Sequence, residues 1–295
     1  MNFSEYAKTY RPFVEAALEK YLPDEGMQPT TIHRAMRYSA LGGGKRLRAL
    51  LAIAGCQAVG GDIRQVEPLV AALEMIHAYS LVHDDLPCMD DDDYRRGKLT
   101  CHKVFGEGLA VLTGDALLTQ GFYLISRLAD VGVDGDTITR VLAELGQACG
   151  TDGLIGGQVV DLESEGKEVS RSTLEYIHTR KTGALFKTSI RCGAIIGGAT
   201  DDQLDIIDTY ADNFGLAFQI TDDILDVVGD EAKLGKAVGS DERHVKATYV
   251  SILGLEQAKQ RAQGAIEAAK EAIVTLEGNT DALVSLAEFV IARDH

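Results

Sequence analysis

The sequence predicts an all-α protein, a bundle of helices around a deep apolar core. Only five prolines interrupt 295 residues, and 45% of the residues are hydrophobic against 25% that are charged. Such a chain can bury a full core, and its many Ala, Leu and Glu residues favour helix over strand. The 31 glycines predict close helix packing. Because no linker or repeat divides the chain, we expect residues 1–295 to form a single domain.

Apolar side chains recur at helical spacing in successive segments, and Gly, Pro, Asn or Asp residues separate them. The segments expected to be helical are 3–22, 30–41, 45–59, 67–86, 110–128, 137–149, 151–161, 172–198, 200–228, 255–276 and 280–293. Pro87 disfavours helical geometry at Leu86, so the fourth helix should bend or end there. The pattern Ser172-Thr-Leu-Glu175 predicts a capping box that starts the eighth helix.

The overall charge and the cysteine content limit the partners of the protein. A net charge of −16 argues against nucleic acid as a ligand. Five widely spaced cysteines without a CxxC pair indicate reduced thiols and a cytoplasmic location. The N-terminus lacks the apolar stretch of a signal peptide, and no uninterrupted apolar run is long enough to span a membrane. We therefore expect no membrane insertion.

An acidic stretch follows the fourth helix and contains Asp84, Asp85 and the run 90–93, closed by Arg95 and Arg96. Charge runs are most often solvated loops. Clustered carboxylates are also stable around a cation, and hard oxygen ligands without a His/Cys set favour Mg²⁺ or Mn²⁺ over zinc. An unbroken helix would stack Asp91 on Asp84, whereas a bulge at Pro87 would place Asp90 there.

A second acidic cluster, Gln219-Ile-Thr-Asp222-Asp223-Ile-Leu-Asp226, lies far along the chain. Asp222 and Asp226 are four residues apart and share one helix face. Because two like charges at this spacing in an apolar helix destabilise it, we expect a cation above them. Two such clusters point to a metal-bridged diphosphate site.

Basic residues accompany both clusters. Gly42–Gly44 precede Lys45 and Arg48, which would lie on one helix face at i and i+3 and could bind phosphate. The alternative is a Gly helix end followed by surface charges. His77 lies seven residues before Asp84, on roughly the same face. Lys181 and Thr182 enter an apolar helix, and the Gly-rich basic segment 234–249, with Lys236 and Lys246, follows the second cluster.

In this order the motifs resemble those of the trans-isoprenyl diphosphate synthases. The match covers His83–Gly97, Gln219–Asp226, Gly43–Arg48, Lys181-Thr182 and Lys236, and it extends from about residue 30 to the end. Within that family the farnesyl diphosphate synthases of bacteria are most similar. The resemblance implies a homodimeric helical bundle that uses Mg²⁺ and joins isopentenyl diphosphate to allylic diphosphates. Geranylgeranyl diphosphate synthase is the alternative within the same family.

The resemblance also implies roles for individual residues. Asp84, Asp90 and Asp222 would bind metal directly, with Asp85 and Asp226 in support. Isopentenyl diphosphate would bind the basic residues Lys45, Arg48, His77 and Arg96. The allylic diphosphate would bind Arg95, Lys181 and Lys236, while Thr182 and Gln219 would line the reacting carbons. The departing diphosphate would take the proton, because no side chain in these motifs suits that role.

Product length should depend on the residues about one turn before Asp84, which are Tyr79 and Ser80. A bulky Tyr79 would close the cavity and stop the chain at fifteen carbons, whereas a small residue would let it lengthen. The alternative is that Tyr79 only packs in the core.

Three further readings predict different features. A class I terpene cyclase normally has an Asn/Ser/Glu metal set in place of the second acidic cluster. A non-catalytic regulatory subunit usually has degraded motifs, and both motifs here are intact. An acidic scaffold without a ligand would leave the basic residues beside both clusters unexplained.

Overall fold

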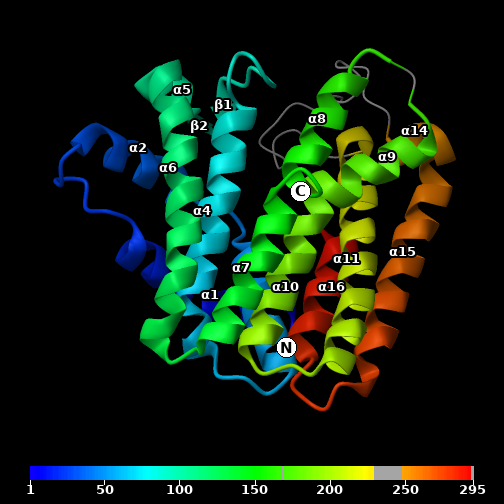
Figure 1. Cartoon of the computed structure of the whole chain (residues 1–295). Helices are drawn as coiled ribbons and strands as arrows, with labels where there is room; N and C mark the ends of the chain where they lie inside the picture. Colours follow the sequence, from blue (N-terminus) through cyan, green and yellow to red (C-terminus); the bar gives the residue numbers. More distant parts are fainter. Residues whose placement is uncertain (168, 229–247, 294–295) are drawn as a thin grey trace.

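Long helices account for most of the computed structural model, which describes residues 1–167, 169–228 and 248–293 (Figure 1). The α-helices are α1 (Phe3–Tyr21), α2 (Thr30–Ala40), α3 (Leu47–Ala58), α4 (Glu67–Asp84), α5 (Cys101–Phe105), α6 (Glu107–Ser126), α7 (Gly135–Cys149), α8 (Leu154–Ser164), α9 (Arg171–Ile177), α10 (Ala184–Ile196), α11 (Asp201–Val228), α14 (Tyr249–Leu253), α15 (Leu255–Ala272) and α16 (Asp281–Ala292). Short 3₁₀ segments are η1 (Ile63–Val66), η2 (Arg127–Val131) and η4 (Ile273–Thr275), and η3 (His178–Gly183) is a π-helix.

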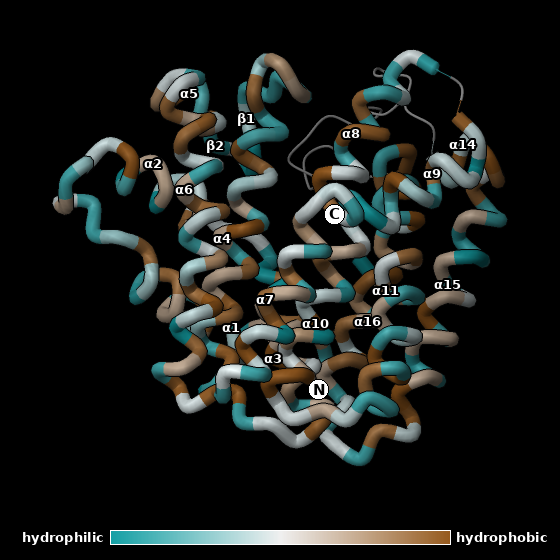
Figure 2. The backbone as a smooth tube through the Cα atoms, in the orientation of Figure 1, coloured by the Kyte–Doolittle hydropathy of each residue, from teal (hydrophilic) through white to brown (hydrophobic). Residues whose placement is uncertain are grey.

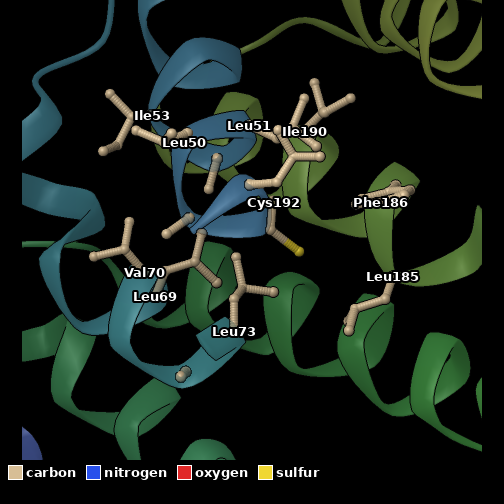
Figure 3. Packing of buried hydrophobic residues seen from close by; sticks show 14 of the residues in the cluster. Leu50, Leu51, Ile53, Leu69, Val70, Leu73, Leu185, Phe186, Ile190 and Cys192 are labelled. Carbon is tan, nitrogen blue, oxygen red and sulfur yellow. The ribbon is translucent and has the colours of Figure 1, made fainter. Parts of the chain in front are cut away.

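Helices α3, α4 and α10 form the centre of the bundle. Nearly every side chain of α3 and most of those of α4 are buried, as expected for helices that are apolar on all sides. Figure 3 shows their side chains meeting in one cluster, with Leu50 and Leu51 from α3, Leu73 from α4, and Ile190 and Phe186 from α10. This cluster anchors α4, the helix that carries the first acidic motif.

Two glycines let α3 and α10 pack with their backbones in contact. A Cβ atom on Gly55 would lie 2.2 Å from the carbonyl oxygen of Ile190, and one on Gly193 would lie 2.0 Å from that of Ala52. Any larger side chain at either position would push the two helices apart. The close packing expected from the glycine content is therefore present at this crossing.

The C-terminal ends of α4 and α11 lie at the same end of the bundle, the upper end in Figure 1. Both acidic motifs therefore gather at that end, although they are far apart in the sequence. Hydrophobic and hydrophilic positions alternate turn by turn along α11 and α15 (Figure 2), as in amphipathic helices on the outside of a core.

The local structure differs from the sequence expectation in several places. Ser170, not Ser172, caps α9, because its side chain accepts the Thr173 N–H and the helix begins at Arg171. A short antiparallel hairpin, β1 (Tyr94–Arg95) and β2 (Lys98–Leu99), and the helix α5 follow the first acidic motif. Among the described residues, one helical stretch, Glu107–Val131, is long and apolar enough to cross a membrane, although 39% of it is buried inside the protein.

Candidate active site

The first acidic motif begins where α4 ends, at Asp84. Pro87 follows and prevents the helix from continuing. The chain turns back, so that the Asp90 N–H donates to the Asp84 carbonyl at 2.9 Å and the Asp91 N–H donates to the Leu86 carbonyl at 3.1 Å. Asp91 has a positive φ of 51° and is exposed. The turn places Asp90 beside Asp84, as expected if the helix breaks at Pro87.

Asp84 lies among other carboxylates and a lysine from η3. Burial raises the pKa of Asp84, and the charges of Asp90 and Asp161 raise it further, while Lys181 and Arg95 lower it. Lys181 Nζ lies 2.7 Å from Asp161 Oδ2. Burial alone would lower the pKa of Lys181, but Asp161 and Asp84 raise it above its ordinary value. Three carboxylates thus face two cations around Asp84 within the described part of the chain, and the surroundings favour added positive charge.

Asp85 and Arg95 form an ion pair at the start of the same motif. Arg95 Nε donates to Asp85 Oδ1 at 2.6 Å, and its Nη2 donates to Asp92 Oδ2 at 3.3 Å. Burial raises the pKa of Asp85 to about 6, although Arg95 lowers it. The pair holds Arg95 against the acidic motif, with its charge beside the carboxylates.

Lys181 and Thr182 belong to the π-helix η3, which joins α9 to α10. π-helical turns insert an extra residue into a helix and are frequent at functional sites. Gly157 of α8 packs against this turn so closely that a Cβ atom on Gly157 would lie 2.3 Å from the backbone nitrogen of Lys181. Because Asp161 is one helical turn after Gly157, the close approach brings its carboxylate to the Lys181 ammonium.

The second acidic motif occupies the last turns of α11, so Asp222 and Asp226 lie on one helix as expected. The side chain of Asp222 is 51% exposed and lies 3.5 Å from Arg293 Nη2 at the C-terminal end of the chain. Asp226 is buried. Asp223 Oδ2 accepts the backbone N–H of Tyr249 at 2.6 Å, which ties the second motif to the first residue of α14.

Buried basic side chains gather beside the first acidic motif. His77 and Arg96 line a cavity that α2, α4 and the hairpin enclose. Burial and the charges of Arg48 and Arg96 lower the pKa of His77 well below its ordinary value. Burial also lowers the pKa of Arg48 to about 10. His77 Nδ1 and Arg48 Nε are buried without hydrogen-bond partners. A buried arginine N–H without a partner, close to a second arginine, is typical of a site that an anion completes.

Arg46 stabilises this cationic region, although the sequence indicated no role for it. It starts α3 with a left-handed φ of 54° and is only 4% exposed. Its Nε and Nη2 donate to the Glu15 carboxylate at 2.9 and 3.1 Å, and its Nη1 lies 3.3 Å from Glu74 Oε2. Glu74 Oε1 also accepts the Ala49 N–H at 3.3 Å. The carboxylates of Glu15 and Glu74 therefore supply the negative charge that compensates burial of the Arg46 guanidinium.

Lys45 does not share a helix face with Arg48, and that expectation is wrong. Helix α3 begins only at Leu47, so Lys45 precedes it and helical spacing does not apply. Lys45 Nζ lies 5.4 Å from the centre of the Phe289 ring and lines a groove between α1 and α16. The Arg48 guanidinium instead lies 4.7 Å from the centre of the Phe186 ring.

The Gly-rich turn before α3 packs against Arg96. Arg96 Nη1 donates to the Gly43 carbonyl at 2.5 Å. A Cβ atom on Gly44 would lie 2.4 Å from the same Nη1, and Gly44 has a φ of +119°. The turn therefore serves to seat Arg96 close to the backbone.

Tyr79 is buried in α4, about one turn before the acidic motif, and is 5% exposed. Its ring packs edge-on against His83, with ring centres 5.7 Å apart, and its hydroxyl has no hydrogen-bond partner. Burial raises the pKa of Tyr79, and Cys149 of α7 and Asp84 make smaller contributions in the same direction. Ser80 Oγ donates to the His77 carbonyl at 2.9 Å. Of Tyr79 and Ser80, the two residues predicted to limit product length, Tyr79 is therefore the bulky one.

The donor set around the first motif fits a divalent cation of the magnesium type. The carboxylates are hard oxygen ligands, and burial raises the pKa values of Asp84 and Asp85, so that a bound cation would stabilise their ionised forms. Among the described residues, no three His, Cys, Asp or Glu side chains converge closely enough to hold a metal. Lys236 lies outside the described residues.

A protein-family model described as polyprenyl synthetase matches residues 29–282. The chain belongs to the polyprenyl synthetase family. Its relatives include the farnesyl diphosphate synthase of Geobacillus stearothermophilus, at 45% identity over 100% of this chain and 99% of the relative. The geranylgeranyl diphosphate synthase of Cyanophora paradoxa is 43% identical over 100% of this chain and 97% of its own. A solved structure of a putative farnesyl-diphosphate synthase from Marinomonas sp. is similar, with a TM-score of 0.85 and 39% identity over 99% of both chains.

Several residues near the acidic motifs of this polyprenyl synthetase had no role in the sequence reading. Asp161 pairs with Lys181, Arg293 approaches Asp222, and His178 packs beside Asp223 and Tyr249. Their partners lie far away in the sequence, so local spacing does not indicate these pairs. The only signal for Asp161 was its place four residues after Gly157 in an otherwise apolar helix.

Proposed function

We propose that the protein catalyses the head-to-tail condensation of isopentenyl diphosphate with the allylic substrates dimethylallyl and geranyl diphosphate, giving farnesyl diphosphate and diphosphate. The observation that carries this proposal is the placement of two acidic motifs at one end of the bundle (Figure 1), with buried atoms of Arg48 and His77 that have no hydrogen-bond partner. Relatives named farnesyl diphosphate synthase and dimethylallyltranstransferase, at 45–46% identity over the whole chain, support it.

The acidic motifs are the proposed metal site. Asp84, Asp90 and Asp222 would bind Mg²⁺ directly, Asp85 and Asp226 would support them, and Mn²⁺ could substitute. When bound, the metal neutralises charge on the diphosphate leaving group. Burial of Asp84 and Asp85 supports this assignment, because buried carboxylates are stabilised in their ionised form by a neighbouring cation.

The basic side chains hold the two substrates. Lys181, Arg95 and Lys236 bind the allylic diphosphate, and the Lys181–Asp161 pair orients the ammonium beside Asp84. The proposed group for isopentenyl diphosphate is Lys45, Arg48, His77 and Arg96, although Lys45 Nζ faces Phe289 in the groove between α1 and α16 in this structure. The buried unpaired atoms of Arg48 and His77 support an anion there.

The reaction needs no protein nucleophile. The allylic C–O bond breaks, and its electron pair leaves with the diphosphate. The basic side chains stabilise the negative charge of this diphosphate. The isopentenyl double bond attacks the allylic carbon beside Thr182 and Gln219, and the new cation loses a proton to the released diphosphate. The product stays at fifteen carbons because the Tyr79 ring, beside Ser80, closes the cavity below Asp84.

One incubation tests the function. Purified protein receives isopentenyl and dimethylallyl diphosphates with Mg²⁺, with and without chelator, and the dephosphorylated products are sized by mass. Farnesol that disappears with chelator supports the proposal in full. Geranylgeraniol would retain the reaction and replace the product assignment. Absence of condensation with every allylic starter would favour the regulatory subunit, and a hydrocarbon from added farnesyl diphosphate would favour a cyclase.

We also propose that residues 1–295 form one polyprenyl synthetase domain that acts as a homodimer in the cytoplasm. Large apolar side chains are exposed along α5, α6 and α7, at Val104, Val111, Leu112, Tyr123 and Leu142. An apolar face of this kind favours association with a second copy. Sedimentation should give twice the chain mass, and Leu112→Glu should shift it to the monomer. A wild-type monomer at micromolar concentration would contradict the dimer.

A further inference from the structure

His178 occupies a three-way junction beside the reactive end of the bundle. It is the first residue of the π-helix η3, and its side chain is only 17% exposed. One face of its ring stacks on Tyr249, with ring centres 5.5 Å apart and planes 16° apart. Its Nε2 lies 3.7 Å from Asp223 Oδ2 and is buried without a hydrogen-bond partner. The imidazole thus connects η3, α11 and α14.

The side chains that His178 meets lie on one face of α11. Gln219 and Asp223 are four residues apart and stack on the same side of the helix. Gln219, which is 8% exposed, borders the same cavity as His178, and its side chain offsets part of the lowering that burial causes in the pKa of the imidazole. Asp223 in turn accepts the Tyr249 N–H, so the stacked tyrosine and the carboxylate are fastened to each other. The ring therefore has little freedom to move.

The same junction is connected through η3 and α11 to the residues that are proposed to face the substrates. Lys181 and Thr182 follow His178 within a single π turn, and Lys181 is held by Asp161 on the opposite side. Gln219 lies one turn before Asp222 on α11. A small rotation between η3 and α11 would move Thr182 and Gln219 relative to each other. Misplacement of reacting groups by about 1 Å costs on the order of 100-fold in rate.

We propose that His178 is a positioning residue. It fills the space between Tyr249, Asp223 and Gln219, and in this way it fixes Gln219 of α11 relative to the η3 turn that carries Thr182. This inference rests on the proposed condensation for its kinetic consequence and on the geometry of the junction for its structural one. His178 acts through Gln219 and does not touch the isopentenyl diphosphate pocket around His77 and Arg48. Its loss should therefore lower kcat and leave the KM for isopentenyl diphosphate unchanged.

The kinetic experiment uses His178→Phe, which retains the stacking on Tyr249 and removes the ring nitrogens, and His178→Gln, which restores a polar group. We expect His178→Phe to lower kcat by about tenfold and His178→Gln to recover part of it. The double variant with Gln219→Asn should be no slower than Gln219→Asn alone, because both changes interrupt one interaction. The control is His33→Phe in α2, where the ring Nδ1 contacts the Met27 carbonyl, and it should leave kcat unchanged.

A spectroscopic measurement tests the contact without substrate. The His178 ring signal in a ¹H–¹³C spectrum, assigned by its loss in His178→Phe or His178→Gln, should shift in Gln219→Asn. A wild-type protein that makes no product would refute the proposed function, and this shift would still decide whether the two side chains are coupled. An unshifted signal, an unchanged kcat in a folded His178→Phe or His178→Gln variant, or additive losses in the double variant would overturn the positioning role.

Discussion

Replacement of Tyr79 by alanine should lengthen the product and destabilise the protein by a predictable amount. The ring is 5% exposed, so Tyr79→Ala is a large-to-small core change, which costs about 3–5 kcal/mol. The hydroxyl has no hydrogen-bond partner, so its removal should offset about 1–3 kcal/mol of this loss in the free energy of unfolding. The free energy of unfolding should therefore fall by about 2 kcal/mol, equivalent to a midpoint temperature roughly 4 °C lower.

Tyr79→Phe is the matched control, because it keeps the ring and removes only the unpaired hydroxyl. Its free energy of unfolding should equal or exceed that of the wild type by about 1 kcal/mol, and its products should remain at fifteen carbons. The assay combines urea unfolding with mass analysis of products made from isopentenyl and geranyl diphosphates. Tyr79→Ala should add longer chains. A spectrum confined to fifteen carbons in a folded Tyr79→Ala protein would refute the role of the ring as the floor of the cavity.

Three further predictions concern the charged groups. Glu74→Gln should lower the free energy of unfolding by about 3 kcal/mol, because it removes a carboxylate that compensates the charge of buried Arg46. The control Glu19→Gln removes the exposed partner of Arg37 and should change the free energy of unfolding by less than about 0.5 kcal/mol. Equal effects of the two variants in urea titrations would contradict this prediction. Burial and nearby arginines lower the pKa of His77, so the unfolded chain takes up its proton at a higher pH, near 6.5, than the folded protein does. The free energy of unfolding should therefore fall as the pH drops below 6.5, and His77→Gln should reduce that slope; identical slopes would exclude it. Lys181→Ala should lower kcat/KM for the allylic diphosphate about 100-fold, whereas Lys187→Ala, which removes the exposed partner of Asp212, should not change it; comparable losses would show that the Lys181 effect is not local.

Local sequence signals were reliable where chemistry and periodicity acted on neighbouring residues. Pro87 ends α4 because its ring and missing N–H interrupt the helix, and that break decides whether Asp90 or Asp91 lies beside Asp84. The spacing of Asp222 and Asp226 placed both on one helix. The spacing of Lys45 and Arg48 misled, because Arg46 adopts a left-handed conformation at the start of α3.

The sequence by itself determined the helical class, the two acidic motifs and most of the basic residues beside them, since each follows from side chains a few positions apart. Only the tertiary structure decided which of these charges are paired. Arg95 lies against Asp85, Lys181 reaches Asp161 from a different helix, and Arg46 is neutralised by Glu15 and Glu74. These partners are 10 to 31 residues apart. Such distances are bridged by helix packing at Gly157 and by burial, which depend on the whole bundle and leave no periodic trace in the chain.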